Sequence, residues 1–194
     1  MEQTDISRIL ALKGKVKGTV FQSDASYMKR HFGSDSLVKV EAKLKEWGQK
    51  LKYEDARAME WYSAGTRIFS LLAIKEVFTL SDDDMFAMGL EGPKHSFIIK
   101  MLLKFFATVE KIFNAAPMVW RRHWDSGELE LVEINEEHKR VVIRLKGIDL
   151  DPVFCKYEEG YFSGIMRLVM PGARASETKC TFRGDDCHEY TFTW

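Results

Sequence analysis

The chain has 194 residues, of which 45% are hydrophobic and 30% are charged, and its 29 basic side chains balance 29 acidic ones. This composition is typical of a globular protein, and the length predicts a single domain over residues 1–194. A net charge of zero argues against a nucleic-acid partner. Because the apolar runs are too short to span a bilayer and the N-terminus lacks a signal-peptide pattern, we expect a cytoplasmic protein.

Hydrophobic periodicity predicts a first half that is mainly helical. A short strand is expected at 15–21, where β-branched residues recur. Capping residues and apolar spacing predict helices at about 24–32, 35–47, 54–61, 66–78 and 93–115, with a further helix start at Ser81. The helix at 93–115 has the widest apolar face, which predicts a central position in the core.

The second half of the chain changes to alternating apolar residues, which are typical of strands. We expect strands at 129–133 and 141–145, a helix at 152–170 and a terminal β-hairpin at 178–194. Gly160 and Gly164 lie four residues apart on that helix and would let another element approach closely. Helices followed by antiparallel strands predict an α+β fold, with the helices packed on one face of the sheet.

All three cysteines lie in the C-terminal quarter of the chain, together with one well-placed carboxylate. Cys155 is expected at a helix start, Cys180 and Cys187 flank the hairpin turn, and Glu177 precedes Cys180 by three residues. Because zinc is usually held by four such groups, these residues are candidate metal ligands. In a regular strand, residues 177 and 180 point to opposite faces, so Glu177 must lie in a loop or bulge to take part. The alternative is that the cysteines are small core residues or free thiols.

Two stretches resemble known families. At the C-terminus, Cys155 is followed by Glu177, Cys180, a Gly-Asp turn, Cys187 and an aromatic-rich strand, which resembles the 4-vinyl-reductase-type sensor domain. The stretch KGTVFQSDASYMKRHFG, at 17–33, is similar to the opening of haem-NO-binding (H-NOX-like) domains. Both families belong to one superfamily, which also includes the small subunits of the Golgi trafficking-particle complex.

The resemblance implies an α+β domain with a buried pocket between helices and sheet, usually as a dimer. In the phenol-sensing relatives, the matching Cys/Glu/Cys/Cys set binds structural zinc beside an aromatic-lined pocket. Carried over by position, Cys155, Glu177, Cys180 and Cys187 become zinc ligands, and we expect zinc as a structural cofactor. Four protein ligands leave no open position for a catalytic water.

Haem is the other cofactor to consider, and its iron commonly takes a histidine as axial ligand. His95, at the start of the helix expected at 93–115, is the histidine best placed for this role, whereas His188 lies in the hairpin. The Tyr-x-Ser-x-Arg pattern with which H-NOX domains hold the haem propionates is absent. We therefore expect a protein without haem.

Aromatic side chains are candidates for the pocket wall, because ligand sites are mostly apolar with a few polar groups. The candidate ligand-binding residues are Trp61, Tyr62, Phe105, Trp120, Trp124 and Tyr161. Trp120 and Trp124 are the preferred pair, since they lie four residues apart beside His123 and each indole adds a polar N–H to an apolar ring. Each of the six has the alternative interpretation of an ordinary core aromatic.

These observations favour a small-molecule-binding sensor or adaptor domain. An enzyme is not expected, because no nucleophile elbow, phosphate-binding loop or HExxH motif occurs, and no cofactor site supports the hydride transfer of a vinyl reductase. The expected partners are a small hydrophobic or aromatic ligand, a second copy of the chain in a homodimer, and a separate signalling protein. Two alternatives stay open: a protein-interaction scaffold like the trafficking subunits, and a haem-based gas sensor.

Overall fold

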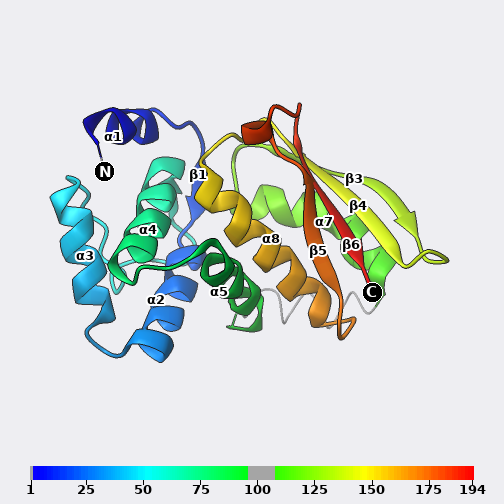
Figure 1. Ribbon diagram of the computed structural model, residues 1–194, viewed down its shortest axis with the longest axis horizontal. Helices are drawn as coiled ribbons and strands as arrows, with labels where there is room; N and C mark the ends of the chain where they lie inside the picture. Colours follow the sequence, from blue (N-terminus) through cyan, green and yellow to red (C-terminus); the bar gives the residue numbers. More distant parts are fainter. Residues whose placement is uncertain (1, 96–107) are drawn as a thin grey trace.

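Helices from the first half of the chain occupy one side of the molecule and a four-stranded sheet the other in the computed structural model, which describes residues 2–95 and 108–194 (Figure 1). The helices are α1 (Gln3–Leu10), α2 (Thr19–Phe32), α3 (Ser36–Glu46), α4 (Ala64–Val77), α5 (Asp82–His95), α7 (Val109–His123) and α8 (Pro152–Arg167). The strands are β1 (Lys15–Lys17), β2 (Trp61–Ser63), β3 (Glu128–Asn135), β4 (Arg140–Lys146), β5 (Arg174–Lys179) and β6 (His188–Thr193). A short 3-10 helix, η1 (Thr181–Arg183), connects β5 to β6.

The larger sheet is antiparallel, with the strand order β3-β4-β6-β5, and β1 pairs with β2 separately. Alternate residues of the central strands point toward the helices, and Ile143, Tyr190 and Phe192 are buried there. α7 packs on β3 and α8 packs on β5. Both helices line one cavity together with Ile143 and Phe192, so they cover the same face of the sheet. The expected α+β class is therefore confirmed.

α8 joins the sheet to the other helices and crosses α5 at very short range (Figure 1). A Cβ atom at Gly160 would lie 2.0 Å from the carbonyl oxygen of Phe86, and one at Gly89 would lie 2.0 Å from that of Tyr157. The two backbones therefore meet where each helix has a glycine, because no other residue leaves this space. The close approach expected at Gly160 is present.

Two helix predictions differ from the structure. No α-helix forms at 54–61; turns lead into β2 instead, because the chain pairs with the segment around β1, where Gly18 N donates to Glu60 O at 3.0 Å. The helix expected at 93–115 is also interrupted, because Thr108 has an extended backbone and precedes the start of α7; residues 96–107 of that prediction lie outside the described ones. α7 begins only at Val109 and continues past Pro117 to His123.

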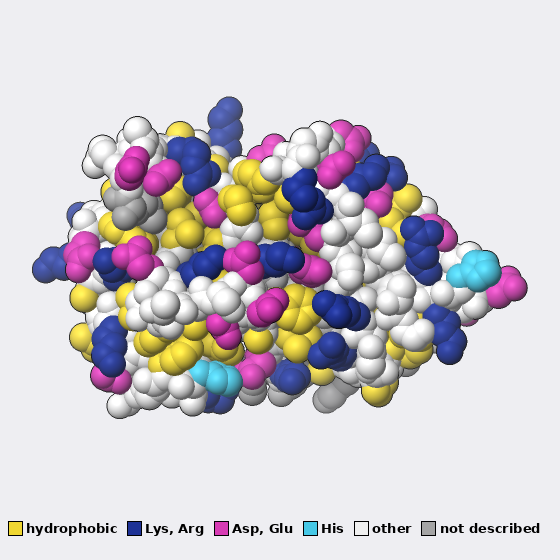
Figure 2. Space-filling view, in the orientation of Figure 1, with side chains coloured by type: hydrophobic (Ala, Val, Ile, Leu, Met, Phe, Trp, Pro, Cys, Tyr) yellow, Lys and Arg dark blue, Asp and Glu magenta, His cyan; other side chains and the backbone are white. Residues whose placement is uncertain are grey.

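The surface carries charges of both signs, which are interspersed on the face shown in Figure 2. Ion pairs such as Lys29–Glu54 and Lys52–Glu41 are spread over this exterior. Among the described helices, none is long and apolar enough to cross a membrane.

Candidate functional site

A cavity of about 140 Å³ lies between α7, α8 and the inward face of the larger sheet, beside the start of α2. Its walls are mainly aliphatic and aromatic, with a few polar side chains. An engineered apolar cavity of ~150 Å³ in another protein is large enough to bind benzene, so this volume suits one aromatic ring. The cavity is therefore the candidate ligand site, since such sites combine apolar walls with few polar groups.

Trp120 and Trp124 form the cavity wall at the C-terminal end of α7. Their rings are stacked, with centroids 5.6 Å apart and an interplanar angle of 11°, and both residues are buried. Trp120 Nε1 donates a hydrogen bond to Ser126 O at 3.0 Å, so the polar end of the indole is satisfied outside the wall. Trp124 meets Phe154 of α8 edge-on, with the centroids 5.4 Å apart. Helices α7 and α8 together hold the tryptophan pair in place.

The predicted ligand-binding residues fall into two groups. Tyr62, on β2, does not line the cavity, and its hydroxyl accepts a hydrogen bond from Arg57 N at 3.0 Å. Trp61 is 42% exposed, and Lys17 Nζ lies 3.8 Å from the centre of its ring. Phe105 lies outside the described residues. The candidates that do line the cavity are Trp120, Trp124 and Tyr161.

An acid and an imidazole also line the cavity. Glu158 of α8 is 6% exposed, and its carboxyl has no hydrogen-bond partner among the described residues. Burial raises the pKa of Glu158 to about 8, and the positive charge of Arg67 only partly opposes this shift. His123 of α7 lies 2.9 Å from Val119 O through Nδ1, which must donate because a carbonyl oxygen can only accept. Its Nε2 atom therefore keeps a lone pair.

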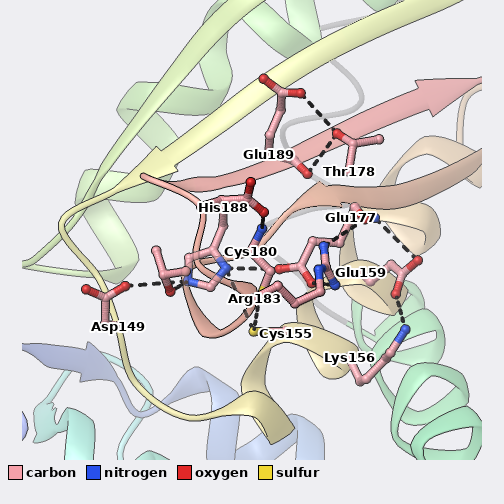
Figure 3. Close-up of polar contacts among 12 residues, drawn as sticks. Asp149, Cys155, Lys156, Glu159, Glu177, Thr178, Cys180, Arg183, His188 and Glu189 are labelled. Carbon is pink, nitrogen blue, oxygen red and sulfur yellow. Dashed lines mark hydrogen bonds and ion pairs between the residues drawn. The ribbon is translucent and has the colours of Figure 1, made fainter.

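A second candidate site connects the start of α8 to the β5–β6 region (Figure 3). Cys155, Glu177, Cys180 and His188 each place one potential ligand atom within 4.8 Å of the others. The sulfur atoms of Cys155 and Cys180 lie 3.7 Å apart, close to the ~3.8 Å expected for two thiolates around one tetrahedral zinc ion. The cluster therefore combines two thiols, a carboxylate and an imidazole in an arrangement that can hold a divalent metal ion.

Glu177 enters this cluster through an irregularity in β5. The pairing of β5 with β6 shifts register between Glu177 and Lys179, and β5 ends at Lys179. Asp185 then accepts a hydrogen bond from Cys180 N at 2.8 Å, which holds the start of the following turn. The shift is the bulge that Glu177 needs, because residues 177 and 180 would otherwise face opposite ways.

His188 belongs to the cluster in place of the fourth predicted ligand, Cys187. The Nδ1 atom of His188 lies 2.9 Å from Glu177 Oε1 and 3.8 Å from Cys155 Sγ. Cys187 lies in the bend just before β6 and is not among the four residues whose ligand atoms come together. The alternation of residues along the strand could have indicated that His188 points inward, since it shares its strand face with Tyr190, whose side chain is buried.

The electrostatics of the cluster favour a neutral Cys155 thiol beside an ionised Glu177 carboxylate. Burial raises the pKa of Cys155, and the nearby Glu177 and Cys180 raise it further. Burial also acts to raise the pKa of Glu177, but the hydrogen bond to His188 and the charges of His188 and Arg183 outweigh it, so that this pKa is lowered. Because thiol ligands must lose their protons, metal binding at this cluster would strengthen as pH rises.

Known structures with the same architecture are H-NOX proteins. A mutant H-NOX protein from K. algicida, in the unliganded Fe(II) state, matches with a TM-score of 0.66 at 13% identity, over 91% of this chain and 95% of that one. An H-NOX protein from S. oneidensis in the Fe(II)NO state gives 0.58 at 14% identity, over 91% and 97%. A structure whose description concerns heme redox potential and protein-induced porphyrin distortion has a TM-score of 0.59 at 11% identity, over 92% of this chain and 99% of that one.

The chain therefore has an H-NOX-like fold, as the resemblance of residues 17–33 predicted. No protein-family model matches the sequence, and no curated protein matches it.

These neighbours correct the expectation about haem. We expected a protein without haem, because the propionate-holding pattern is absent and His95 was the best-placed histidine. That expectation is contradicted, since the matching structures include Fe(II) H-NOX proteins and one described by its heme. His95 lies in α5, which begins at Asp82, rather than at the start of a helix, and its side chain lies outside the described ones. The histidine in the cavity wall is His123.

Proposed function

We propose that this chain is a small-molecule-binding sensor domain whose ligand occupies the cavity between α7 and α8. The observation that carries the proposal is the cavity itself, in which a stacked tryptophan pair lines a volume of about 140 Å³ next to a carboxyl without a partner among the described residues. A core built for stability alone would fill such a space, because protein interiors are normally close-packed. The role is binding rather than catalysis, and the H-NOX-like fold supports it.

A cavity-filling variant tests this proposal. Ala116 lines the cavity from α7, whereas Met118 on the same helix is 37% exposed and does not line it. Native mass spectrometry of the purified protein should detect a co-purified small molecule, and Ala116→Phe should abolish it while Met118→Phe retains it. Tryptophan fluorescence should report toluene binding in the same pattern, because Trp120 and Trp124 form the wall. Equal binding by both variants would place the ligand elsewhere.

We further propose that a divalent metal ion, such as zinc, stabilises the C-terminal part of this domain. Cys155, Glu177 and Cys180 come from the predicted ligand set, and His188 supplies the fourth group. Thr181 Oγ1 lies 3.0 Å from His188 Nε2, which supports this assignment because metal-binding imidazoles usually donate their other N–H to an oxygen. With four protein ligands the ion would be structural, fixing α8 against β5 and β6.

A haem-based sensor is the second candidate function, and the fold neighbours favour it. The donor chemistry of the cavity suits haem: His123 keeps a free Nε2 lone pair, its Nδ1 proton is held by Val119 O, and the surrounding wall is aromatic. A haem exceeds a single ring, so the cavity of about 140 Å³ would have to widen to admit it. When bound, haem supplies an iron that binds diatomic gases.

Haem reconstitution distinguishes the two candidates. Purified protein is titrated with hemin, and a Soret band that sharpens with a one-to-one end point supports the haem sensor. His123→Ala should then shift or remove that band, while His138→Ala, in the exposed β3–β4 turn, should leave it unchanged. Absence of a saturable Soret change would leave the small-molecule sensor as the supported function.

We also propose that signalling passes through a homodimer and a separate partner protein. Light scattering coupled to size-exclusion chromatography should give twice the 22.5 kDa chain mass. A ligand-free protein that nevertheless captures a partner through a surface groove would instead favour the scaffold role of the trafficking subunits.

A further inference from the structure

Glu158 is the single acidic side chain among the described residues that line the cavity, and none of them is Lys or Arg. Its carboxyl has no hydrogen-bond partner in the described part of the chain, although the residue is only 6% exposed. Buried carboxyl groups are normally paired, because burial without a partner costs folding free energy. The position of Glu158 is thus unfavourable for stability and suited to a ligand.

The charged and ionisable groups around Glu158 do not neutralise it. Arg67 of α4 is the cation that acts on its charge, but this guanidinium is already bound to the buried carboxylate of Asp24. Three tyrosines also interact with the charge of Glu158: Tyr157 and Tyr161 of α8, and Tyr190 of β6. Burial and the negative charge of Glu158 both raise the pKa of each phenol. These phenols therefore stay neutral.

We propose that the cavity binds a small aromatic amine, with its ring against the wall formed by the tryptophan pair and its ammonium group at Glu158. This inference rests on the proposed function, because it assigns a ligand class to the same cavity. A ring fits the volume of about 140 Å³, and an ammonium offers three N–H donors to the carboxyl that lacks a partner. The faces of Trp120, Trp124 and Tyr161 attract a cation as well.

The same geometry disfavours other ligand classes. A carboxylate ligand would face Glu158 with the imidazole of His123 and no lysine or arginine in the described wall to compensate it. A neutral ring would fill the space but leave the carboxyl unpaired. The amine class therefore follows from charge complementarity together with aromatic lining.

Proton release accompanies this mode of binding. Burial raises the pKa of Glu158 to about 8, so the carboxyl is mostly protonated in the free protein at neutral pH. An ammonium group beside it stabilises the carboxylate and lowers that pKa, and the proton leaves for the solvent. The bound pair is then an ammonium and a carboxylate, with total charge conserved.

Isothermal titration calorimetry with three probes tests the inference on the intact chain. Benzylamine, toluene and benzoate share one ring and differ in charge, and each is titrated near neutral pH in two buffers of different ionisation enthalpy. We expect benzylamine to bind on the order of tenfold more tightly than toluene, with benzoate weakest, because hydrogen bonds to charged groups contribute more than neutral contacts. The buffer dependence should show proton release for benzylamine alone.

Glu158→Gln keeps the shape of the side chain and removes its charge. It should weaken benzylamine binding on the order of tenfold, abolish proton release and leave toluene binding unchanged. Glu110→Gln, an exposed acid on α7, is the matched control and should change none of these values. If wild-type protein binds toluene as tightly as benzylamine, the amine inference is wrong while the proposed sensor function stands. If it binds none of the probes, both are overturned.

Discussion

His188 Nδ1 and Glu177 Oε1 lie 2.9 Å apart on neighbouring strands, with Cys155 Sγ 3.8 Å from the same imidazole nitrogen. A carboxylate can only accept, so Nδ1 carries the proton in this arrangement. A metal ion would take the place of that proton, and His188 would then donate through Nε2 to Thr181 Oγ1. One imidazole is therefore positioned for either a hydrogen bond or metal ligation.

Zinc binding should depend on His188 and not on Cys187. Elemental analysis should give about one zinc per wild-type chain, since the cluster offers four ligands to one ion. His188→Ala and Cys155→Ser should lose the metal, and a chelator should lower the unfolding temperature, because zinc binding free energy is also folding free energy. Cys187→Ser, the matched cysteine control, should keep the metal, and chelator should still lower its unfolding temperature.

The reverse pattern would be equally informative. Loss of zinc in Cys187→Ser with retention in His188→Ala would restore the ligand set expected from the sequence. Zinc-free protein with three freely titratable thiols would show that the cluster is a hydrogen-bonded core and not a metal site.

The crossing of α5 and α8 should tolerate no side chain at Gly89. Gly89→Ala places a Cβ 2.0 Å from a backbone oxygen of Tyr157, which cannot rotate away, so we expect a loss of about 3 kcal/mol in unfolding free energy. Gly92→Ala, one turn later on α5, meets only side-chain atoms, the ring of Tyr161 at 3.3 Å and the hydroxyl of Tyr157 at 3.4 Å. It should cost less than about 1 kcal/mol, because alanine also favours the helix. Urea titration of both variants measures the difference.

Asp24 and Arg67 form an ion pair in which each side chain is 1% exposed. Asp24→Asn would leave the guanidinium charged and uncompensated in the interior, so we expect a loss of about 3–5 kcal/mol in unfolding free energy. Glu54→Gln breaks the exposed pair with Lys29 and should have little effect. Similar losses in both variants would mean that burial does not determine the strength of these pairs.

Local patterns in the sequence predicted much of this fold. Alternating apolar residues predicted the positions of β3, β4 and β6, and Asp151 before Pro152 marked the start of α8, where its side chain accepts a hydrogen bond from Val153 N. The turns before β2 were missed, because strand pairing with distant residues decided the conformation there. Propensity is a weak guide wherever tertiary contacts compete with it.

The candidate sites were predicted less completely, for a geometric reason. The spacing of three residues in the sequence indicated a metal site: Cys155, Glu177 and Cys180. The side chain of His188 could be placed only once the register of the strands was known. Glu158 gave no signal at all, because a glutamate on a helix normally faces water. Only the tertiary arrangement, in which α7 and α8 line one cavity, shows that this carboxyl faces it.

Glu158 should also make stability fall as pH rises. Its folded pKa is about 8 against a usual value of 4.5, so between these values the folded protein holds a proton that the unfolded chain has lost. The free energy of unfolding therefore decreases through this window, by about 1.4 kcal/mol for each unit of pKa difference. Other groups titrate as well, so the informative quantity is the difference between variants.

Glu158→Gln removes this titration and Glu110→Gln does not. Urea unfolding from about pH 5 to about pH 9 should show Glu158→Gln gaining stability over wild type as pH rises and then levelling off above the folded pKa. Glu110→Gln should run parallel to wild type throughout, because its carboxyl is exposed. A constant difference between Glu158→Gln and wild type would mean that the carboxyl ionises as freely in the folded protein as in the unfolded chain, and the cavity would then be open to water.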